Sequence, residues 1–121
     1  KGYDTPLTRM FDGGQEISVG QWQRVALARS FFPASRFIVM DEPSSALDPR
    51  AEFDLFDGFR DRLEGRGALV ISHRLSTVRM ADYTYVLDKG RIVEHGTHDH
   101  LVDTGGVYAS LFEKQARNYR N

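Results

Sequence analysis

A pair of acidic residues directly follows a short apolar run, and these two residues could do chemistry. Phe37–Met40 is continuously apolar, and Asp41 and Glu42 come immediately after it. Such a run is expected for a strand that is buried on both faces of a parallel sheet. Open α/β sheets bind ligands beyond the carboxyl ends of their strands, so both carboxylates are placed to act on a ligand. An acidic pair of this kind can also simply cap the next turn.

A second candidate site is the segment Ser18–Gln21, which precedes a stretch that favours helix. A helix N-terminus has backbone N–H groups without intrahelical partners and a partial positive charge, so it can bind an anion. Ser18 adds a hydroxyl, and Gly20 lets a phosphate approach the backbone closely. Taken alone, the segment is also compatible with an ordinary capped helix.

Two further segments contain residues of chemical interest. Ser45–Asp48 follows the acidic pair, and Asp48 before Pro49 is typical of a helix start, with a carboxylate cap before proline. His73 ends a second apolar run, Ala68–Ser72. A single histidine after a strand is more often structural than catalytic, so its meaning depends on the neighbouring motifs.

Apolar spacing predicts the elements that would position these residues. Residues 1–16 read as an irregular entry segment, and a helix is expected from about residue 20 to residue 31, before Pro33. The helix that begins at Asp48 is expected to end at Gly65 and Gly67. The repeat in the first helix consists of Trp22, Val25, Ala26 and Arg29, and the predicted face of the second consists of Phe53, Phe56, Phe59 and Leu63.

The remaining residues predict shorter elements. Residues 68–72 are expected to form a second buried strand, and residues 75–81 a short helix. Residues 83–88 and 91–95 flank the Lys89-Gly90 turn and predict a hairpin. Thr97 could cap a helix through about residue 102, and a last helix is lined by Tyr108, Leu111, Phe112 and Gln115. Strands that alternate with helices indicate an α/β protein.

Composition excludes several classes of protein. The chain has 121 residues, and its 16 basic and 17 acidic side chains give a net charge of −1, so there is no bulk electrostatic case for nucleic-acid binding. It has no cysteine, which excludes disulfides and thiolate metal sites. Its apolar runs are far shorter than the roughly 20 residues that a membrane-spanning helix needs, and we expect no signal peptide among these residues.

Together, the motifs resemble the ATP-binding cassette (ABC) ATPases. ISVGQ, followed by WQR and ALAR, is similar to the family's signature loop, which is usually LSGGQ. FIVMDE is similar to the Walker B strand of the family. SSALD is similar to its D-loop, and VISHRLST to the segment that carries its switch histidine. The resemblance covers essentially the whole chain, but only the C-terminal half of a nucleotide-binding domain. It implies a partial P-loop NTPase (RecA-like) α/β fold, with a mostly parallel sheet and flanking helices. Residues 1–35 would end the helical subdomain, and residues 36–121 would run from Walker B to the C-terminal helix.

The resemblance also implies roles for the candidate residues. Asp41 would help to hold Mg²⁺ through water, because Mg²⁺ keeps much of its hydration shell. Glu42 would orient and deprotonate the attacking water. His73 would contact the γ-phosphate of ATP as a hydrogen-bond donor or charge stabiliser. Ser45 and Asp48 would belong to the D-loop, which crosses the dimer interface and helps to place the water.

The signature loop would act on a second subunit. Ser18 and Gly20 match residues that contact the γ-phosphate of ATP held by the opposite subunit, and Gln21 completes this ATP-binding loop. Val19 departs from the pattern, because the family most often has glycine at that position.

The P-loop motif G-x-x-x-x-G-K-[ST] is absent from the chain, which has no Gly-Lys pair. The chain also begins at Lys1 inside what looks like a continuing loop, which suggests a piece of something longer. In the family the P-loop strand lies between the strand ending at His73 and the strand at residues 83–88. Its absence would leave unpaired backbone groups in mid-sheet. We therefore expect the isolated chain to be unstable or partly molten, and inactive as an ATPase.

The strings outside the motifs, such as DTPLTRMFDGGQE and GGVYASLF, look most like exporters. This implies ATP hydrolysis that powers export, at the cytoplasmic face of a membrane. The implied partners are a second ABC ATPase domain, in a homodimer or heterodimer, and a transmembrane domain on the same full-length chain. Peptide, lipid and drug substrates stay open.

Three alternatives remain. One is a soluble ABC ATPase that acts on nucleic acid, and another is a truncated, non-catalytic remnant or trans partner. The third is a metal site at the cluster His95, His98, Asp99 and His100, which is disfavoured because the family carries a similar stretch without using metal.

Overall fold

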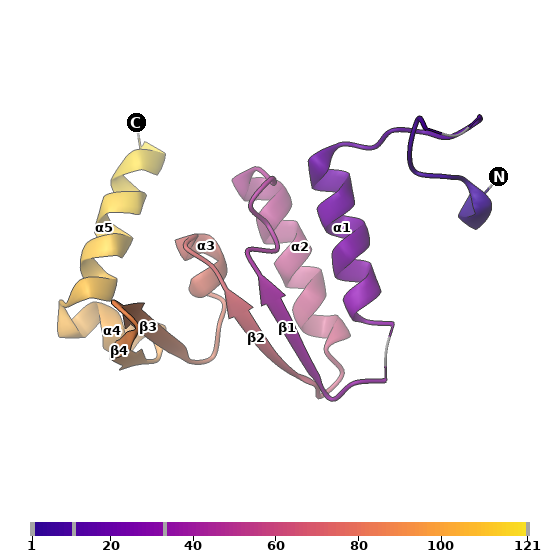
Figure 1. Ribbon diagram of the computed structural model, residues 1–121. Helices are drawn as coiled ribbons and strands as arrows, with labels where there is room; N and C mark the ends of the chain where they lie inside the picture. The colour runs from indigo at the N-terminus through magenta and orange to yellow at the C-terminus, as the bar shows by residue number, and fades with distance from the viewer. Residues whose placement is uncertain (1, 11, 33, 121) are drawn as a thin grey trace.

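The computed structural model describes residues 2–10, 12–32 and 34–120 as an α/β arrangement (Figure 1). Every helix and strand expected from the sequence is present, and a short 3₁₀ turn occurs in the entry segment. In chain order the elements are η1 (Gly2–Asp4), α1 (Val19–Ser30), β1 (Phe37–Asp41), α2 (Pro49–Arg62), β2 (Gly67–Ile71), α3 (Leu75–Val78), β3 (Thr84–Asp88), β4 (Arg91–Gly96), α4 (His98–Thr104) and α5 (Val107–Arg120).

The strands form two separate two-stranded sheets. β1 and β2 are parallel, with Phe37 opposite Gly67 and Asp41 opposite Ile71. β3 and β4 are antiparallel, with a register shift between Val86 and Leu87. Within the described ranges no ladder joins β2 to β3. The sheet is thus divided between the same two strands that the resemblance places on either side of the P-loop strand.

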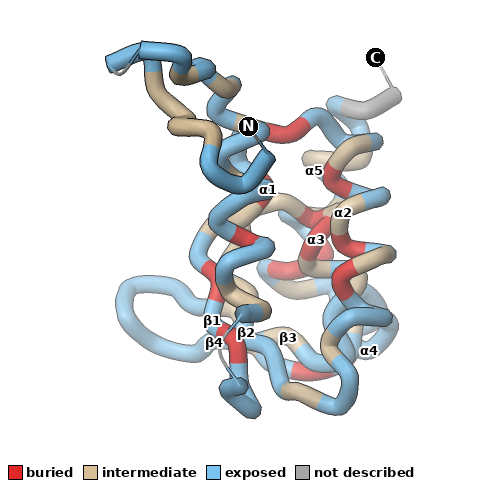
Figure 2. The backbone as a smooth tube through the Cα atoms, turned by 90° about the vertical axis from the view of Figure 1, so that its right-hand side faces the viewer, coloured by how far each residue is buried: buried red, intermediate tan, exposed pale blue. Residues whose placement is uncertain are grey.

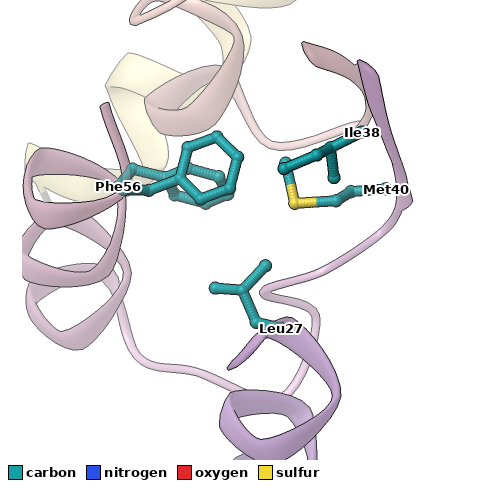
Figure 3. Close-up of a cluster of buried hydrophobic side chains, with 5 residues drawn as sticks. Leu27, Ile38, Met40 and Phe56 are labelled. Atoms are coloured by element: carbon teal, nitrogen blue, oxygen red, sulfur yellow. The ribbon is translucent and has the colours of Figure 1, made fainter. Parts of the chain in front are cut away.

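The core lies between the β1–β2 pair and the two helices α1 and α2, which run side by side next to it in Figure 1. Figure 3 shows Leu27, Ile38, Met40 and Phe56 pointing toward one another. Phe59 completes this cluster and meets Phe56 edge-on, with ring centroids 6.0 Å apart. Burial of such side chains contributes roughly 1.5–3 kcal/mol each, so this cluster stabilises the packing of the strands against the two helices.

The expectation that both parallel strands are buried on two faces is wrong. Ile38 and Met40 are buried, whereas Val39 on the opposite face of β1 is 61% exposed. The exposed face continues onto β2 through Leu69 and Ile71. The reason is that α1 and α2 pack against one face of the pair, and the described residues leave side chains on the other face exposed. In Figure 2 short buried stretches, in red, alternate along the chain with exposed ones, in pale blue.

The predicted repeat in α1 identifies the helix but not its buried face. Trp22 is 46% exposed and Val25 is also exposed, whereas Leu27 is the buried residue of this helix. Trp22, which belongs to the predicted repeat, therefore lies outside the core cluster. On α2, Phe56 and Phe59 are buried as predicted, but Phe53 is exposed because it lies outside the contact with β1.

The predicted helix caps and the hairpin turn are confirmed. Asp48 accepts backbone hydrogen bonds at the start of α2, and Thr97 does so at the start of α4. Lys89 and Gly90, with φ of 47° and 75°, turn the chain between β3 and β4. Two successive positive φ values match the right-handed twist of the paired strands.

Candidate nucleotide site

Glu42 and His73 meet at the carboxyl ends of β1 and β2. The Glu42 N–H donates to the Ile71 carbonyl at 2.8 Å, which continues the parallel ladder by one residue. Glu42 Oε1 then accepts a hydrogen bond from the His73 backbone N–H at 3.0 Å and lies 2.8 Å from His73 Nδ1. A carboxylate and an imidazole from neighbouring strand ends therefore form one polar pair.

Two features of Glu42 are typical of functional sites. Its φ is 47°, a left-handed conformation that costs a non-glycine residue about 1–3 kcal/mol. Its second carboxylate oxygen, Oε2, is buried and has no hydrogen-bond partner in the part of the chain that the structure describes. A buried carboxylate oxygen normally has a donor, so its environment fits a further polar group. Asp41, the last residue of β1, is exposed next to this pair.

The segment at the start of α1 is a reciprocal cap. Ser18 Oγ accepts from the Gln21 N–H at 3.2 Å, while Gln21 Oε1 accepts from the Ser18 N–H at 2.7 Å. Gly20 faces the loop after β1, since a Cβ atom there would lie 3.2 Å from Leu47 Cδ2 and 3.6 Å from the Ala46 carbonyl oxygen. The small residue lets the two segments approach each other.

An open hollow of about 570 Å³ lies where these two segments meet. It includes the α1 N-terminus, where the first backbone N–H groups have no intrahelical acceptor, together with a hydroxyl and an arginine, and these groups suit an anionic ligand. Its lining residues are Ser18–Gln21, Arg24, Ala46–Asp48 and Ala51. The structure thus brings the residues predicted from the signature loop together with Asp48. Val19 also lines this hollow, and its side chain is exposed.

Gln23 fixes the loop Ser45–Asp48 against α1, a role that the sequence did not reveal. Its Nε2 donates to Ser45 Oγ at 2.7 Å, and its Oε1 accepts from the Ala46 N–H at 3.0 Å. Gln23 stands in the WQR string, but side-chain bonding across 22 residues leaves no local pattern that would predict it.

The buried Glu52 and the half-buried Arg74 form an ion pair beneath the same loop, and the sequence did not reveal them either. Arg74 donates to the Ser44 and Leu47 carbonyls at 2.7 and 2.8 Å and to Glu52 Oε2 at 3.2 Å. Glu52 is 1% exposed and also accepts from the hydroxyl of Ser44 at 2.7 Å. Removing one partner of such a pair is costly because the other charge stays buried.

The pKa of Asp48 is lowered from the usual value of an aspartate. The hydrogen bond from the Ala51 N–H is the main cause that lowers its pKa, opposed by desolvation. The Arg50 N–H and the charge of Arg24 lower the pKa further. Asp48 is therefore held as a carboxylate at the edge of the hollow.

The histidines near the hairpin contact different tyrosines. His95 Nδ1 lies 2.7 Å from the Tyr83 hydroxyl, and His98 Nδ1 lies 2.8 Å from the Tyr108 hydroxyl. Among residues 2–10, 12–32 and 34–120, no three potential ligands gather around a point that could hold a metal ion. Nor does any helix within those ranges combine the length and apolarity needed to cross a membrane.

Comparison with known proteins finds relatives that match nearly the whole chain. The chain is 44% identical to the subtilin transport ATP-binding protein SpaT of Bacillus subtilis over 98% of its own length, which is 19% of that protein. It is 44% identical to an ATP-dependent lipid A-core flippase of Bordetella avium over 97% of the chain, again 19% of that protein. The chain thus spans about a fifth of the length of these relatives. No family model matches it.

A solved structure has the same architecture. A bacterial Atm1-family ABC exporter with ATP bound superposes with a TM-score of 0.76 and 35% identity, over 89% of this chain and 20% of the exporter. The mixed α/β arrangement, with its small parallel and antiparallel sheets, is therefore that of an exporter ATPase domain. Over nearly its whole length the chain therefore matches the C-terminal ATPase region of exporter-type ABC transporters.

Proposed function

We propose that the chain forms part of an ATP-hydrolysing site that powers export through a membrane. The single observation that carries this proposal is the Glu42–His73 pair, at 2.8 Å, at the carboxyl ends of two parallel strands. Open α/β sheets bind ligands at that edge, and a carboxylate beside an imidazole provides both a base and a phosphate contact. The names of the relatives, which are transport proteins and flippases, agree with this function.

In the proposed mechanism Glu42 takes a proton from water while the water oxygen attacks the γ-phosphorus. ADP leaves with the electrons of the broken phosphorus–oxygen bond. General-base help of this kind contributes about 10²–10⁴-fold in rate. His73 donates a hydrogen bond to the γ-phosphate, where negative charge must be stabilised. Its contact with Glu42 would keep the imidazole beside the proposed base.

The site also fits Mg²⁺. Asp41 is an exposed carboxylate that directly precedes Glu42 in the chain, and Mg²⁺ takes one or two carboxylates together with water and substrate phosphates. Bound Mg²⁺ would neutralise charge on the transferred phosphoryl group. We assign Asp41 to hold it through water.

The hollow at the α1 N-terminus would receive the γ-phosphate of a second subunit. Ser18 and Gly20 offer a hydroxyl and an unobstructed backbone, and Gln21 keeps the loop closed by its capping bond. Ser45 and Asp48 lie on the neighbouring loop, which would cross the interface and help to place the attacking water. The proposed partner is thus a second ABC ATPase domain, and the second partner is a transmembrane domain of the full-length protein.

In this assignment residues 1–35 end the helical subdomain and residues 36–121 run from Walker B to the C-terminal helix. The domain would act at the cytoplasmic face of the membrane. The isolated 121-residue chain, which contains no P-loop motif, would hydrolyse no ATP by itself.

Steady-state ATP hydrolysis by the full-length protein that contains this chain tests the proposal. Ser18→Ala removes the hydroxyl offered to phosphate, and we expect it to lower kcat by about 10²-fold, the effect of losing one transition-state donor. Ser18→Thr keeps both the hydroxyl and the helix cap and should retain most of the activity. Equal kcat values for Ser18→Ala and the parent would contradict a phosphate contact at this loop.

A further inference from the structure

Gln115, on the C-terminal helix α5, forms hydrogen bonds with the backbone on both sides of Arg74, in the segment that contains His73. Its Nε2 donates to the His73 carbonyl at 2.8 Å, and its Oε1 accepts from the Leu75 N–H at 3.1 Å. The carbonyl can only accept and the N–H can only donate, so these two contacts fix the orientation of the amide. A single side chain thus spans the loop from 42 residues away.

With the Gln115 contact, both the backbone N–H and the carbonyl of His73 are hydrogen-bonded. The His73 N–H is held by Glu42 Oε1 at 3.0 Å, and Gln115 holds the His73 carbonyl. The imidazole itself is 76% exposed, so packing contributes little to its placement. With the N–H and the carbonyl of His73 both bound, Glu42 and Gln115 set the direction of its Cα–Cβ bond, and the contact between Nδ1 and Glu42 limits rotation of the imidazole.

α5 is anchored well enough to serve as the support. Glu94, on β4, accepts from the Val107 and Tyr108 N–H groups at 2.7 and 2.9 Å, which fixes the start of the helix. Tyr108 is 2% exposed and stands seven positions before Gln115, two turns earlier on the same face. The position of Gln115 is therefore determined by the hairpin and the α5 helix.

We propose that Gln115 is a positioning residue for His73. Through Gln115, the C-terminal helix α5 would keep the His73 side chain in the position from which it contacts the γ-phosphate. This inference rests on the proposed function, because His73 needs a fixed position only if it contacts a reacting group. Its role differs from that of a residue that merely docks α5, since it acts on catalysis through the backbone of His73.

The test measures kcat, KM for ATP and thermal unfolding in the full-length protein that contains this chain. Gln115→Met keeps the length of the side chain but removes both hydrogen bonds, and Gln115→Asn is too short to make both. We expect each to lower kcat by about tenfold, within the loss that a displacement of about 1 Å can cause, with KM changed less than about twofold. Phe112→Leu is the control, because it loosens the packing of α5 against His98 without touching the His73 loop.

The inference is supported if the Gln115 variants lose kcat while Phe112→Leu lowers the unfolding temperature and keeps kcat. It is overturned if the kcat of either Gln115 variant equals that of the parent while His73→Ala is inactive. It is also overturned if Phe112→Leu loses as much kcat as Gln115→Met, which would indicate a docking role only. A fully active His73→Ala protein would instead contradict the proposed function of His73, and with it the need for Gln115.

Discussion

At the scale of single residues, local sequence patterns predict some side chains of the candidate site but not others. Asp41, Glu42 and His73 were predicted because each follows an apolar run, and the structure brings Glu42 and His73 together. Gln23 and Gln115 were not predicted as contacts, since each bonds to backbone or side chains more than 20 residues away. Contacts between residues so far apart in the chain depend on the tertiary fold, and no characteristic residue spacing in the sequence predicts them.

The lowered pKa of Asp48 makes a prediction for its helix. A carboxyl whose pKa is lower in the helix than in the coil stabilises the helix above the coil pKa, and this contribution is lost as pH falls through the helical value. In a peptide of residues 46–65, acidification from neutral pH should therefore reduce helicity through this group. Asp48→Asn keeps a good neutral cap, so we expect a smaller acid-induced loss of circular-dichroism signal. An equal loss in both peptides would contradict a cap that depends on the charge of Asp48.

At the scale of elements, the sequence predicted the existence and order of helices and strands better than their buried faces. The predicted face of α1 included Trp22, yet Leu27 is the residue in the core. The alternation in β1 is similarly invisible, because both Ile38 and Val39 are apolar although only Ile38 is buried. In a sequence, apolar residues on an uncovered surface cannot be told from core residues. Their burial depends on which other elements pack against them.

The start of α5 makes the second prediction. Glu94→Ala removes the acceptor of two backbone N–H groups, and losing a cap of this kind costs about 1 kcal/mol. Gly106→Ala should have a similar effect, because an added Cβ would overlap the Glu94 carboxylate and displace it. Hydrogen exchange of the α5 amides in the full-length protein measures the loss.

The control for this prediction is Glu113→Ala, which removes an exposed carboxylate 3.8 Å from Arg117 on the same helix. An exposed pair of this type contributes about 0.3–0.5 kcal/mol, so its effect should be the smallest. Because Gly106→Ala and Glu94→Ala act on the same contact, their double variant should lose less than the sum. Additive losses would show that Gly106 matters for another reason.

At the scale of the whole molecule, the two separate sheets limit what the 121 residues can do alone. β2 and β3 do not pair, and the open face of β1 and β2 exposes Val39, Leu69 and Ile71. The sequence predicted this division only through its resemblance to a family, because no local pattern marks which strand is missing from a sheet. An apolar strand face that is exposed in this way favours loose packing or association.

The isolated chain should therefore show far-ultraviolet signal for helix but weak near-ultraviolet signal, and it should bind a dye specific for exposed apolar surface. We expect a broad thermal transition, since the β3–β4 hairpin and the β1–β2 pair share no ladder. A sharp cooperative transition with a strong near-ultraviolet signal would contradict this expectation.

The central claim is that Glu42 performs the chemistry of an ATPase, and single-turnover hydrolysis in the full-length protein tests it most directly. Glu42→Gln preserves the size of the side chain but removes the base. The account predicts that this variant binds ATP with nearly unchanged affinity and hydrolyses it about 10²–10⁴-fold more slowly than the parent. If Glu42→Gln hydrolyses bound ATP as fast as the parent, the assignment of Glu42 is wrong.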